Sequence, residues 1–210
     1  MIRKKTWFPV VYMFCLTAFF STIVIGFTQA TGQRVEANEK LAFEKAVLAA
    51  LPGLYEENLS RMELHKRFTE SFSPPDDSSG AAYTFRQNGQ IIAYALPFSG
   101  QGFWAPIKGV IGIKADKKTI TGIAFYQQNE TPGLGAEIAK TAFTEQFRDK
   151  VISIDGRLIN VKRPGSVLGN SDVHAVTGAT QTSTRLEKII NDGLKEWLSQ
   201  TTTKSGEELP

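Results

Sequence analysis

Four hydroxyl side chains surround a turn of small residues near the end of the chain, in the segment Val176–Ser183. Gly178 and Ala179 keep side-chain bulk off this turn, and the hydroxyls belong to Thr177, Thr180, Thr182 and Ser183. Apolar residues then recur at helical spacing, and Thr184–Glu187 has the form of a capping box. The first turn of a helix offers unpaired N–H groups and the positive end of its dipole to a phosphate. The pattern predicts a site for a phosphate-bearing ligand, with an ordinary Thr/Ser helix cap as the alternative.

Two glycine-containing segments could shape the rest of such a site. Gln101–Gly109 places Trp104 between glycines, which would give a flat apolar wall that a planar ring can approach closely. Asn129–Glu137 is a Pro-Gly turn that leads into an expected helix. The alternatives are a turn with a core tryptophan for the first segment and a plain strand-to-helix loop for the second.

These segments resemble motifs of one known family. Thr177–Thr180 is similar to the S/T-G-A-T flavinylation motif of FMN-binding subunits of bacterial respiratory complexes. They are the G subunit of the Rnf complex and the C subunit of the Na+-translocating NADH:quinone oxidoreductase. Glu130–Gly135 matches the family's E-T-P-G-L-G loop, and Gly102–Trp104 lies where the family has G-x-G-x-W/Y. The motifs occur in the family's order, and a single apolar helix precedes them as in the family, so the resemblance covers nearly the whole chain.

The resemblance implies an FMN cofactor joined through its phosphate to the hydroxyl of Thr180, by a separate flavin transferase that uses FAD and Mg2+. It implies that Trp104, Thr131 and Leu134 line the flavin, with Lys162 near its polar edge or phosphate. The other expected cofactor-binding residues lie in the same motifs: Thr177, Gly178, Ala179, Thr182, Gly133 and Gly135. No catalytic residue and no metal ligand is expected, because the cofactor carries the redox chemistry.

One position departs from the family pattern. The family has Asp three residues before the S/T-G-A-T tetrad, and this chain has His174 there. Asp172 lies two residues earlier and could substitute only if the loop shifts. Because the transferase reads this neighbourhood, the departure bears on the efficiency of modification. The alternative is that His174 is an exposed loop residue.

The N-terminal part of the chain predicts a membrane anchor. Arg3, Lys4 and Lys5 precede the uncharged stretch 6–33. The apolar centre of this stretch, 8–27, is about 20 residues long, which suffices for a hydrocarbon core of roughly 30 Å. A cleaved signal peptide is the alternative, with Thr28–Ala30 as the small residues, although such signals have shorter apolar regions. The basic residues predict a cytoplasmic N-terminus and an extracytoplasmic domain. The resemblance implies that the membrane is the bacterial inner membrane.

Composition narrows the chemistry that is open to this chain of 210 residues. Beyond the three basic residues ahead of the anchor, basic and acidic residues balance, so no nucleic-acid binding is expected. Cys15 is the only cysteine, and His65 and His174 are far apart in sequence. An Fe–S cluster, a disulfide within the chain or a His-based metal centre is therefore not expected. We expect two domains: 1–33, a basic stub and transmembrane anchor, and 34–210, the FMN-binding domain.

The exported part shows the periodicities of an α+β fold. Helices are expected at 36–51 and 136–150, the second with Ile138, Ala142 and Phe147 turned inward. Hairpins are expected for 83–87 with 90–95 across Asn88–Gly89, for 109–113 with 119–126, and for 151–154 with 157–161. The stretch 54–72 is mixed, and 73–80 is a loop. The fold class expected is a single transmembrane helix followed by one domain with a mostly antiparallel sheet flanked by helices. Neither a Rossmann nor a P-loop fingerprint is present.

The leading hypothesis is therefore an electron-transfer flavoprotein subunit of an ion-translocating Rnf-type complex, with other membrane subunits and a flavin transferase as partners. Such a protein transfers electrons and is not catalytic alone. One alternative is an extracytoplasmic binding or assembly module with noncovalent or no flavin. Another is a flavin-bearing donor domain for a separate reductase.

Overall fold

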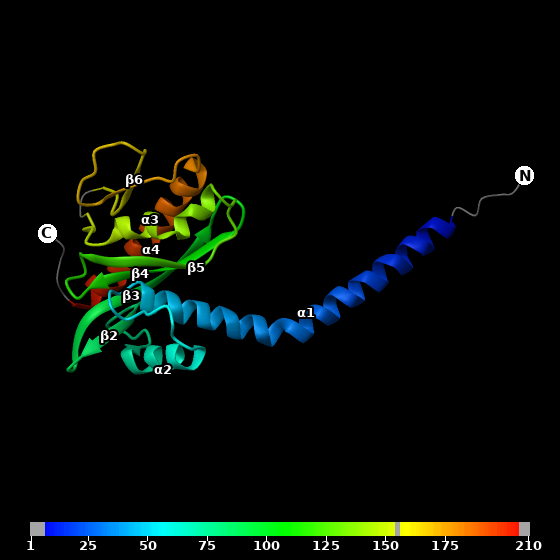
Figure 1. Cartoon of the computed structure of the whole chain (residues 1–210), viewed down its shortest axis with the longest axis horizontal. Coiled ribbons are helices and arrows are strands. Elements are labelled where there is room, and N and C mark those ends of the chain that lie inside the picture. The colour runs from blue at the N-terminus through cyan, green and yellow to red at the C-terminus, as the bar shows by residue number, and fades with distance from the viewer. Residues whose placement is uncertain (1–6, 154–155, 206–210) are drawn as a thin grey trace, which may run out of the picture. The chain divides into compact units, whose positions relative to one another are not determined.

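The computed structural model describes residues 7–153 and 156–205. The chain divides into two compact units, 1–40 and 41–210. The first helix, α1 (Trp7–Ala49), contributes to both. The second unit holds the sheet and the remaining helices (Figure 1).

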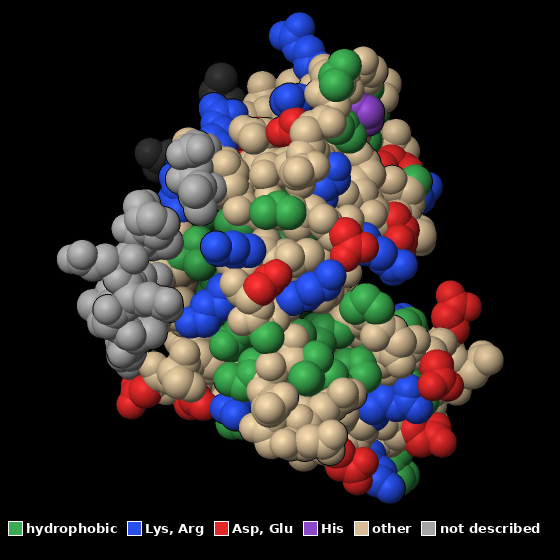
Figure 2. All heavy atoms as spheres, turned by 90° about the vertical axis from the view of Figure 1, so that its left-hand side faces the viewer, with side chains coloured by type: hydrophobic (Ala, Val, Ile, Leu, Met, Phe, Trp, Pro, Cys, Tyr) green, Lys and Arg blue, Asp and Glu red, His purple; other side chains and the backbone are tan. Residues whose placement is uncertain are grey.

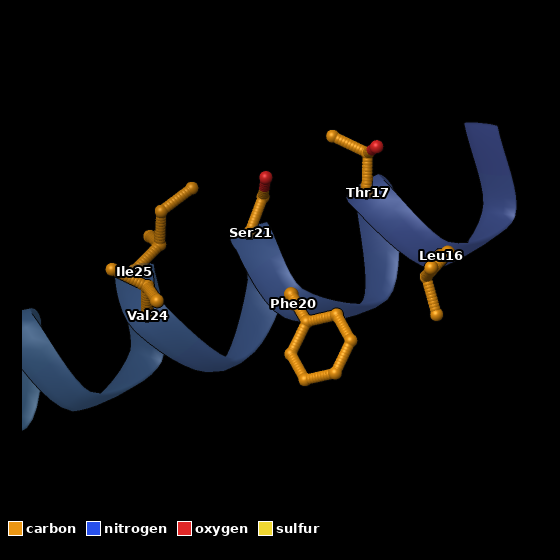
Figure 3. Close-up of a pocket in the computed structure, with 6 residues that line it drawn as sticks. All are labelled: Leu16, Thr17, Phe20, Ser21, Val24 and Ile25. Carbon is orange, nitrogen blue, oxygen red and sulfur yellow. The ribbon is translucent and has the colours of Figure 1, made fainter. Parts of the chain in front are cut away.

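The described residues of the first unit, 7–40, all belong to α1 and include its long apolar part. This helix is long and apolar enough to cross a membrane, and its most apolar stretch has no buried side chain. Figure 3 shows six side chains there, with Thr17 and Ser21 on one side of the helix and Leu16 and Phe20 on the other. All six come from one helix, so this is an open helix surface rather than an enclosed cavity. Arg3, Lys4 and Lys5, which carry the topology prediction, lie outside the described residues.

The main sheet has five antiparallel strands in the order β1-β2-β3-β4-β5. Their bounds are β1 Phe72–Ser73, β2 Tyr83–Gln87, β3 Gln90–Gln101, β4 Pro106–Lys114 and β5 Ile120–Gln127. The first two predicted hairpins are confirmed. Asn88 and Gly89 have φ values of 50° and 79°, as a type I′ turn requires. β3 runs six residues past the predicted end at Ala95, and this extension delivers Gly102–Trp104 to the site.

Two hydrophobic cores lie on opposite faces of this sheet. Along β3, Tyr94, Leu96 and Phe98 enter one core, and Ala93 and Ala95 enter the other. This alternation is the period-2 pattern of a strand that is covered on both faces. The first core is closed by α4 (Thr180–Ser205), and the second by the end of α1 and by α2 (Arg61–Ser71). Figure 1 shows α4 and α2 on opposite sides of the sheet. The predicted α+β class is thus confirmed.

Three local predictions are wrong. The predicted helix 136–150 is a series of short turns: η1 Gly135–Ala139, α3 Thr141–Thr144 and η2 Glu145–Phe147. Ile138 and Phe147 are buried as expected, but Ala142 is exposed because the breaks rotate Phe143 inward instead. Among the described residues after Lys150, 151–153 also form no strand hairpin with 157–161.

In place of that hairpin, β6 (Asn160–Lys162) pairs in parallel with β7 (Asp172–His174). The Ser153 amide donates to the Leu158 carbonyl at 2.9 Å, which closes only a short turn. Ile154 and Asp155, part of the predicted hairpin, lie outside the described residues. The third error concerns Thr184–Glu187, which lies inside α4 and caps nothing, because α4 begins at Thr180.

The capping box of this chain belongs to α2, within the stretch predicted as mixed. The Glu63 amide donates to Ser60 Oγ at 3.3 Å, and the Ser60 amide donates to Glu63 Oε2 at 2.9 Å. This reciprocal pair satisfies two of the amides that a helix start leaves free. It fixes where α2 begins and places its apolar side chains against the end of α1.

Charges are mixed by sign on the surface. On the face in Figure 2, basic and acidic side chains lie among one another, with apolar side chains between them. This fits the balance of basic and acidic residues in the sequence after Lys5. The expectation that no nucleic acid binds stays a prediction.

The helix α4 is held in place by buried polar contacts as well as by its apolar face. Asn191 Nδ2 donates to the Ile159 carbonyl at 2.8 Å, and Asn191 Oδ1 accepts from the Ile159 amide at 3.1 Å. Trp197 Nε1 donates to the Ser79 carbonyl at 2.8 Å. These contacts fix the register of α4 and therefore the position of its first turn.

We expect Asn191→Ala to lower the free energy of unfolding by about 2–3 kcal/mol, because it leaves the buried Ile159 amide and carbonyl without partners. Thermal or urea unfolding measures the effect. Lys195→Ala, an exposed change on the same helix, is the matched control. Equal stability of the two variants would contradict this role of Asn191.

Candidate functional site

The start of α4 is set by the turn before it. Gly178 has a φ of 77°, a conformation that favours glycine. A Cβ at Gly178 would lie 3.0 Å from Leu134 Cδ2, so the turn also packs closely on the neighbouring loop. The Ser183 amide donates to the Ala179 carbonyl at 3.0 Å, which is the first helical bond. By helix geometry, the amides of Thr180, Gln181 and Thr182 have no partner within α4.

The side chains of this turn divide into two groups. Thr177 and Thr180 are exposed, whereas Thr182 and Ser183 are buried. Ser183 Oγ accepts from the Val176 amide at 3.2 Å and so closes the turn. The exposed Thr180 hydroxyl therefore lies at the positive end of a long helix, in reach of an incoming group.

A buried carboxylate connects this turn to the two other predicted segments. Glu130 is only 5% exposed. Its Oε1 accepts from the amides of Phe103 at 2.9 Å and Trp104 at 3.1 Å. Its Oε2 accepts from the Thr182 hydroxyl at 2.6 Å. One side chain thus ties the end of β3, the Glu130–Gly135 loop and the first turn of α4 together.

Two glycines make room for this carboxylate. A Cβ at Gly135 would lie 2.6 Å from Thr182 Oγ1 and 2.9 Å from Glu130 Oε2. A Cβ at Gly102 would lie 2.6 Å from Glu130 Oε1. Both approaches are closer than real Cβ contacts come, so a side chain at either position would displace the carboxylate. Gly133 is different: it has a φ of 75° and open space, so its requirement is conformational.

Exposed apolar side chains flank the Thr180 turn. Trp104 is 66% exposed, and its Nε1 donates to Thr131 Oγ1 at 3.1 Å, which fixes the indole against the loop. Leu134 is 43% exposed and touches the Gly178 position. Phe103 meets Trp104 edge to face, with ring centroids 5.0 Å apart. An exposed tryptophan held by a hydrogen bond is suited to contact a planar ligand rather than to fill the core.

A hollow of about 530 Å³ lies beside this turn. It is bounded by Gly133 of the loop, by Val176 and Thr177, and by Lys140 and Gln146 of the following turns. Lys140 Nζ lies 2.9 Å from Glu137 Oε1, in an ion pair whose lysine is exposed and whose glutamate is half-buried. The hollow therefore combines backbone, hydroxyl and basic groups at the edge of the site.

Lys162 is held by another group. Its Nζ lies 2.7 Å from Asp172 Oδ2, and it also donates to the Val167 carbonyl at 3.4 Å. Asp172 is buried and also accepts from the Gly169 amide at 2.6 Å. The hydrogen bonds from Lys162 and Gly169 hold the pKa of the Asp172 carboxyl below its usual value. Asp172 is therefore committed to this pair and is not available to take the place of His174.

His174 is fixed rather than loose. Its amide donates to Gln146 Oε1 at 2.7 Å, and its Nε2 lies 2.9 Å from the Ser166 carbonyl. It ends β7, directly ahead of the segment that leads to Thr180. The alternative of an exposed loop residue does not describe this half-buried strand position.

Most of the predicted site residues converge. The contacts above bring Trp104, Thr131, Leu134, Gly135, Gly178 and Thr182 into one cluster, with Thr177, Ala179 and Thr180 on the same turn and Gly133 beside the hollow. Lys162 is joined to it only through β6 and β7. The sequence reasoning missed Glu130, although the residue begins the quoted E-T-P-G-L-G loop. It also missed Arg185, whose guanidinium carbon lies 5.9 Å from the Phe103 ring centroid.

Comparison with known proteins gives one consistent result. Residues 102–195 match the FMN-binding domain family. The chain is 34% identical over 124 residues to the G subunit of the proton-translocating ferredoxin:NAD(+) oxidoreductase complex of Clostridium ljungdahlii, covering 59% of this chain and 61% of that one. It is 29% identical over 147 residues to the C subunit of the Na(+)-translocating NADH-quinone reductase of Pasteurella multocida. That match covers 69% of this chain and 51% of that subunit. The chain thus spans between about half and three fifths of these relatives.

A solved structure agrees with the fold. The crystal structure of the C subunit of the Na(+)-translocating NADH-quinone reductase from Parabacteroides distasonis has a TM-score of 0.68 and 25% identity. The match covers 83% of this chain and 96% of that one. The resemblance predicted from the three motifs is therefore confirmed: residues 102–195 match the FMN-binding domain family, and the C and G subunits above are homologues of this chain.

Proposed function

We propose that this chain is a membrane-anchored electron-transfer subunit that carries FMN by a phosphoester bond to Thr180, in an ion-translocating complex of the Rnf type. The observation that carries the proposal is the exposed Thr180 hydroxyl at the start of α4, set by Glu130 beside Trp104 and Leu134. The larger share of the G subunit that the chain covers, 61% against 51% of the C subunit, favours the Rnf type over the quinone reductase.

The residues around Thr180 fit an FMN group. The first-turn amides of α4 have no partner in the helix, and together with the helix dipole they favour a phosphate on Thr180. Trp104, Thr131 and Leu134 provide a wall with an apolar face and a hydroxyl, which suits a ring with one polar edge. The hollow beside Thr177 gives space for the part of the ligand between ring and phosphate.

Each part of this chain has a positioning task. FMN supplies the ability to take up and release electrons, and the protein supplies orientation. Glu130 keeps the Trp104 amide and the Thr182 hydroxyl at fixed positions, so the wall and the attachment point stay in register. The covalent bond retains the cofactor where free FMN would be diluted.

Attachment requires a partner. In the step proposed, the Thr180 oxygen forms a bond to the FMN phosphorus of FAD while the pyrophosphate bond breaks, AMP leaves and the hydroxyl proton passes to a base. The described residues hold no cluster of His, Cys, Asp and Glu suited to a metal ion. A flavin transferase with Mg2+ would supply this chemistry.

The location follows from the anchor. The apolar part of α1 would cross the bacterial inner membrane once and contact other membrane subunits of the complex. The basic residues ahead of it favour a cytoplasmic N-terminus and an extracytoplasmic FMN domain.

We expect Thr180→Ala to abolish the covalent flavin and Thr180→Ser to keep it, because only a hydroxyl can form the phosphoester. Intact mass of the chain from its own host measures an increase of about 438 Da, FMN less water. Thr184→Ala, which removes an exposed threonine one turn later, is the control and should keep the full mass. Unmodified Thr180 in native membranes, with no bound flavin, would favour the flavin-free binding module.

We expect Glu130→Gln to reduce flavin occupancy several-fold and to lower the free energy of unfolding by about 1–3 kcal/mol, because the amide NH2 cannot accept the hydrogen bonds that one carboxylate oxygen accepts. In-gel flavin fluorescence per chain and thermal unfolding measure the two effects. Glu145→Gln, in an exposed ion pair with Arg148 outside the hollow, should change neither by much. Full occupancy and unchanged stability of Glu130→Gln would refute the role given to this carboxylate.

A further inference from the structure

The end of β3 has an unpaired edge. β2 pairs with β3 only as far as Tyr83 opposite Ala95, whereas β4 accompanies β3 to Gln101. Among the described strands, none pairs with residues 97–101 of β3 on the side that β2 leaves free. An open edge of this kind presents backbone groups that another strand can pair with.

The hydrogen-bond pattern shows which groups face that edge. The Ala115 amide donates to the Ile92 carbonyl and the Gly102 amide to the Ala105 carbonyl, each at 3.0 Å. Even-numbered residues of β3 therefore direct their backbone groups to β4, and odd-numbered residues direct theirs away. Ser99 and Gln101 offer both an N–H and a C=O to the free edge, and Pro97 offers a C=O only.

Beside this edge lies a groove of about 480 Å³, formed by residues 97–101 of β3 and one face of α4. The groove floor follows from two close approaches. Gly100 lies under Ile189, because a Cβ on Gly100 would lie 2.6 Å from Ile189 Cγ1. A Cβ on Gly193 would lie 3.4 Å from Phe98 Cβ. The small residues let α4 lie close against β3, so the groove has a packed floor beside the open edge.

The α4 wall of the groove has a charge order. Arg185 and Lys188 lie toward the Gln101 end, and Asp192 and Glu196 lie toward the Pro97 end. All four are exposed and share one helix face by their spacing of three or four residues. In the part of the chain that the structure describes, the ion pairs do not include Lys188 or Asp192.

We propose that this groove, named here the β3–α4 groove, binds an extended segment of another protein by strand addition to residues 97–101. The side chains of such a segment that face α4 lie opposite Gly100 and Phe98, two residues apart. Charge complementarity then requires an acidic residue opposite Gly100, near Lys188, and a basic residue opposite Phe98, near Asp192. The occupant is thus a segment with an acidic and a basic residue at positions i and i+2.

The groove ends at the flavin site. Arg185 belongs to its wall and contacts Phe103, the neighbour of Trp104. A partner seated in the groove would be fixed beside the Trp104 wall, as an electron-exchanging partner must be. The binding itself goes beyond the proposed function and does not depend on the flavin.

Photo-crosslinking in native membranes tests the proposal. A benzoyl-phenylalanine in place of Gln101 should cross-link one segment of another protein with the i, i+2 charge pair, identified by peptide mass spectrometry. The same probe in place of Gln87, exposed at the far end of the sheet, is the control and should not capture that segment. The Thr180→Ala chain should cross-link equally, which separates this proposal from the flavin assignment.

Two variants separate the backbone and charge contributions. Ser99→Pro removes the edge N–H and should lower the yield from the Gln101 probe about tenfold, while Ser99→Ala should not. Lys188→Glu should lower the yield about fivefold, and Lys195→Glu, on the same helix outside the groove, should not. Thermal unfolding checks that each variant is folded. If Ser99→Pro is not folded, the comparison of Lys188→Glu with Lys195→Glu decides.

Three results would overturn the proposal. The first is no cross-link from Gln101, or capture of the same segment from Gln87. The second is a captured segment that lacks the charge pair or comes from a second copy of this chain. The third is an equal loss of yield with Lys195→Glu and Lys188→Glu.

Discussion

The site depends on a single buried carboxylate that has to satisfy three segments at once. Glu130 accepts two backbone amides from the end of β3 and one hydroxyl from the first turn of α4. Burying a charge is costly unless hydrogen bonds compensate for the lost water, and here each oxygen has such partners. The glycines at 102 and 135 are needed because the donors must come this close. The geometry of the site thus follows from the need to bring hydrogen-bond donors to the buried Glu130 carboxylate.

The rest of the domain serves to bring those three segments together. The long β3 carries one of them, and β4 and β5 return the chain to the loop that holds Glu130. The helix α4 supplies the third, and Asn191 and Trp197 fix its register from the other end. The two cores clamp the sheet between α4 and the end of α1, so these positions are set by packing on both faces.

Much of this could be predicted from sequence, and the failures have physical reasons. Asn88–Gly89 predicts its hairpin because few other residues accept its backbone angles. The prediction of one helix at 136–150 was wrong because the spacing of its apolar residues does not reveal the breaks that tertiary contacts impose. The β6–β7 pairing was missed since parallel pairing joins distant segments without a turn signal. Lys162 has the right charge for its predicted place, but Asp172 competes for it at 2.7 Å.

The exposure of Thr180 bears on the order in which the mature protein is made. In the folded domain its hydroxyl is already outside, at the end of a formed helix, and the Glu130 frame around it is complete. A modifying enzyme would therefore meet a finished surface rather than an unfolded peptide. Under the proposed function, attachment of FMN would therefore follow folding of the domain, and a misfolded chain would not present the Thr180 turn to the transferase.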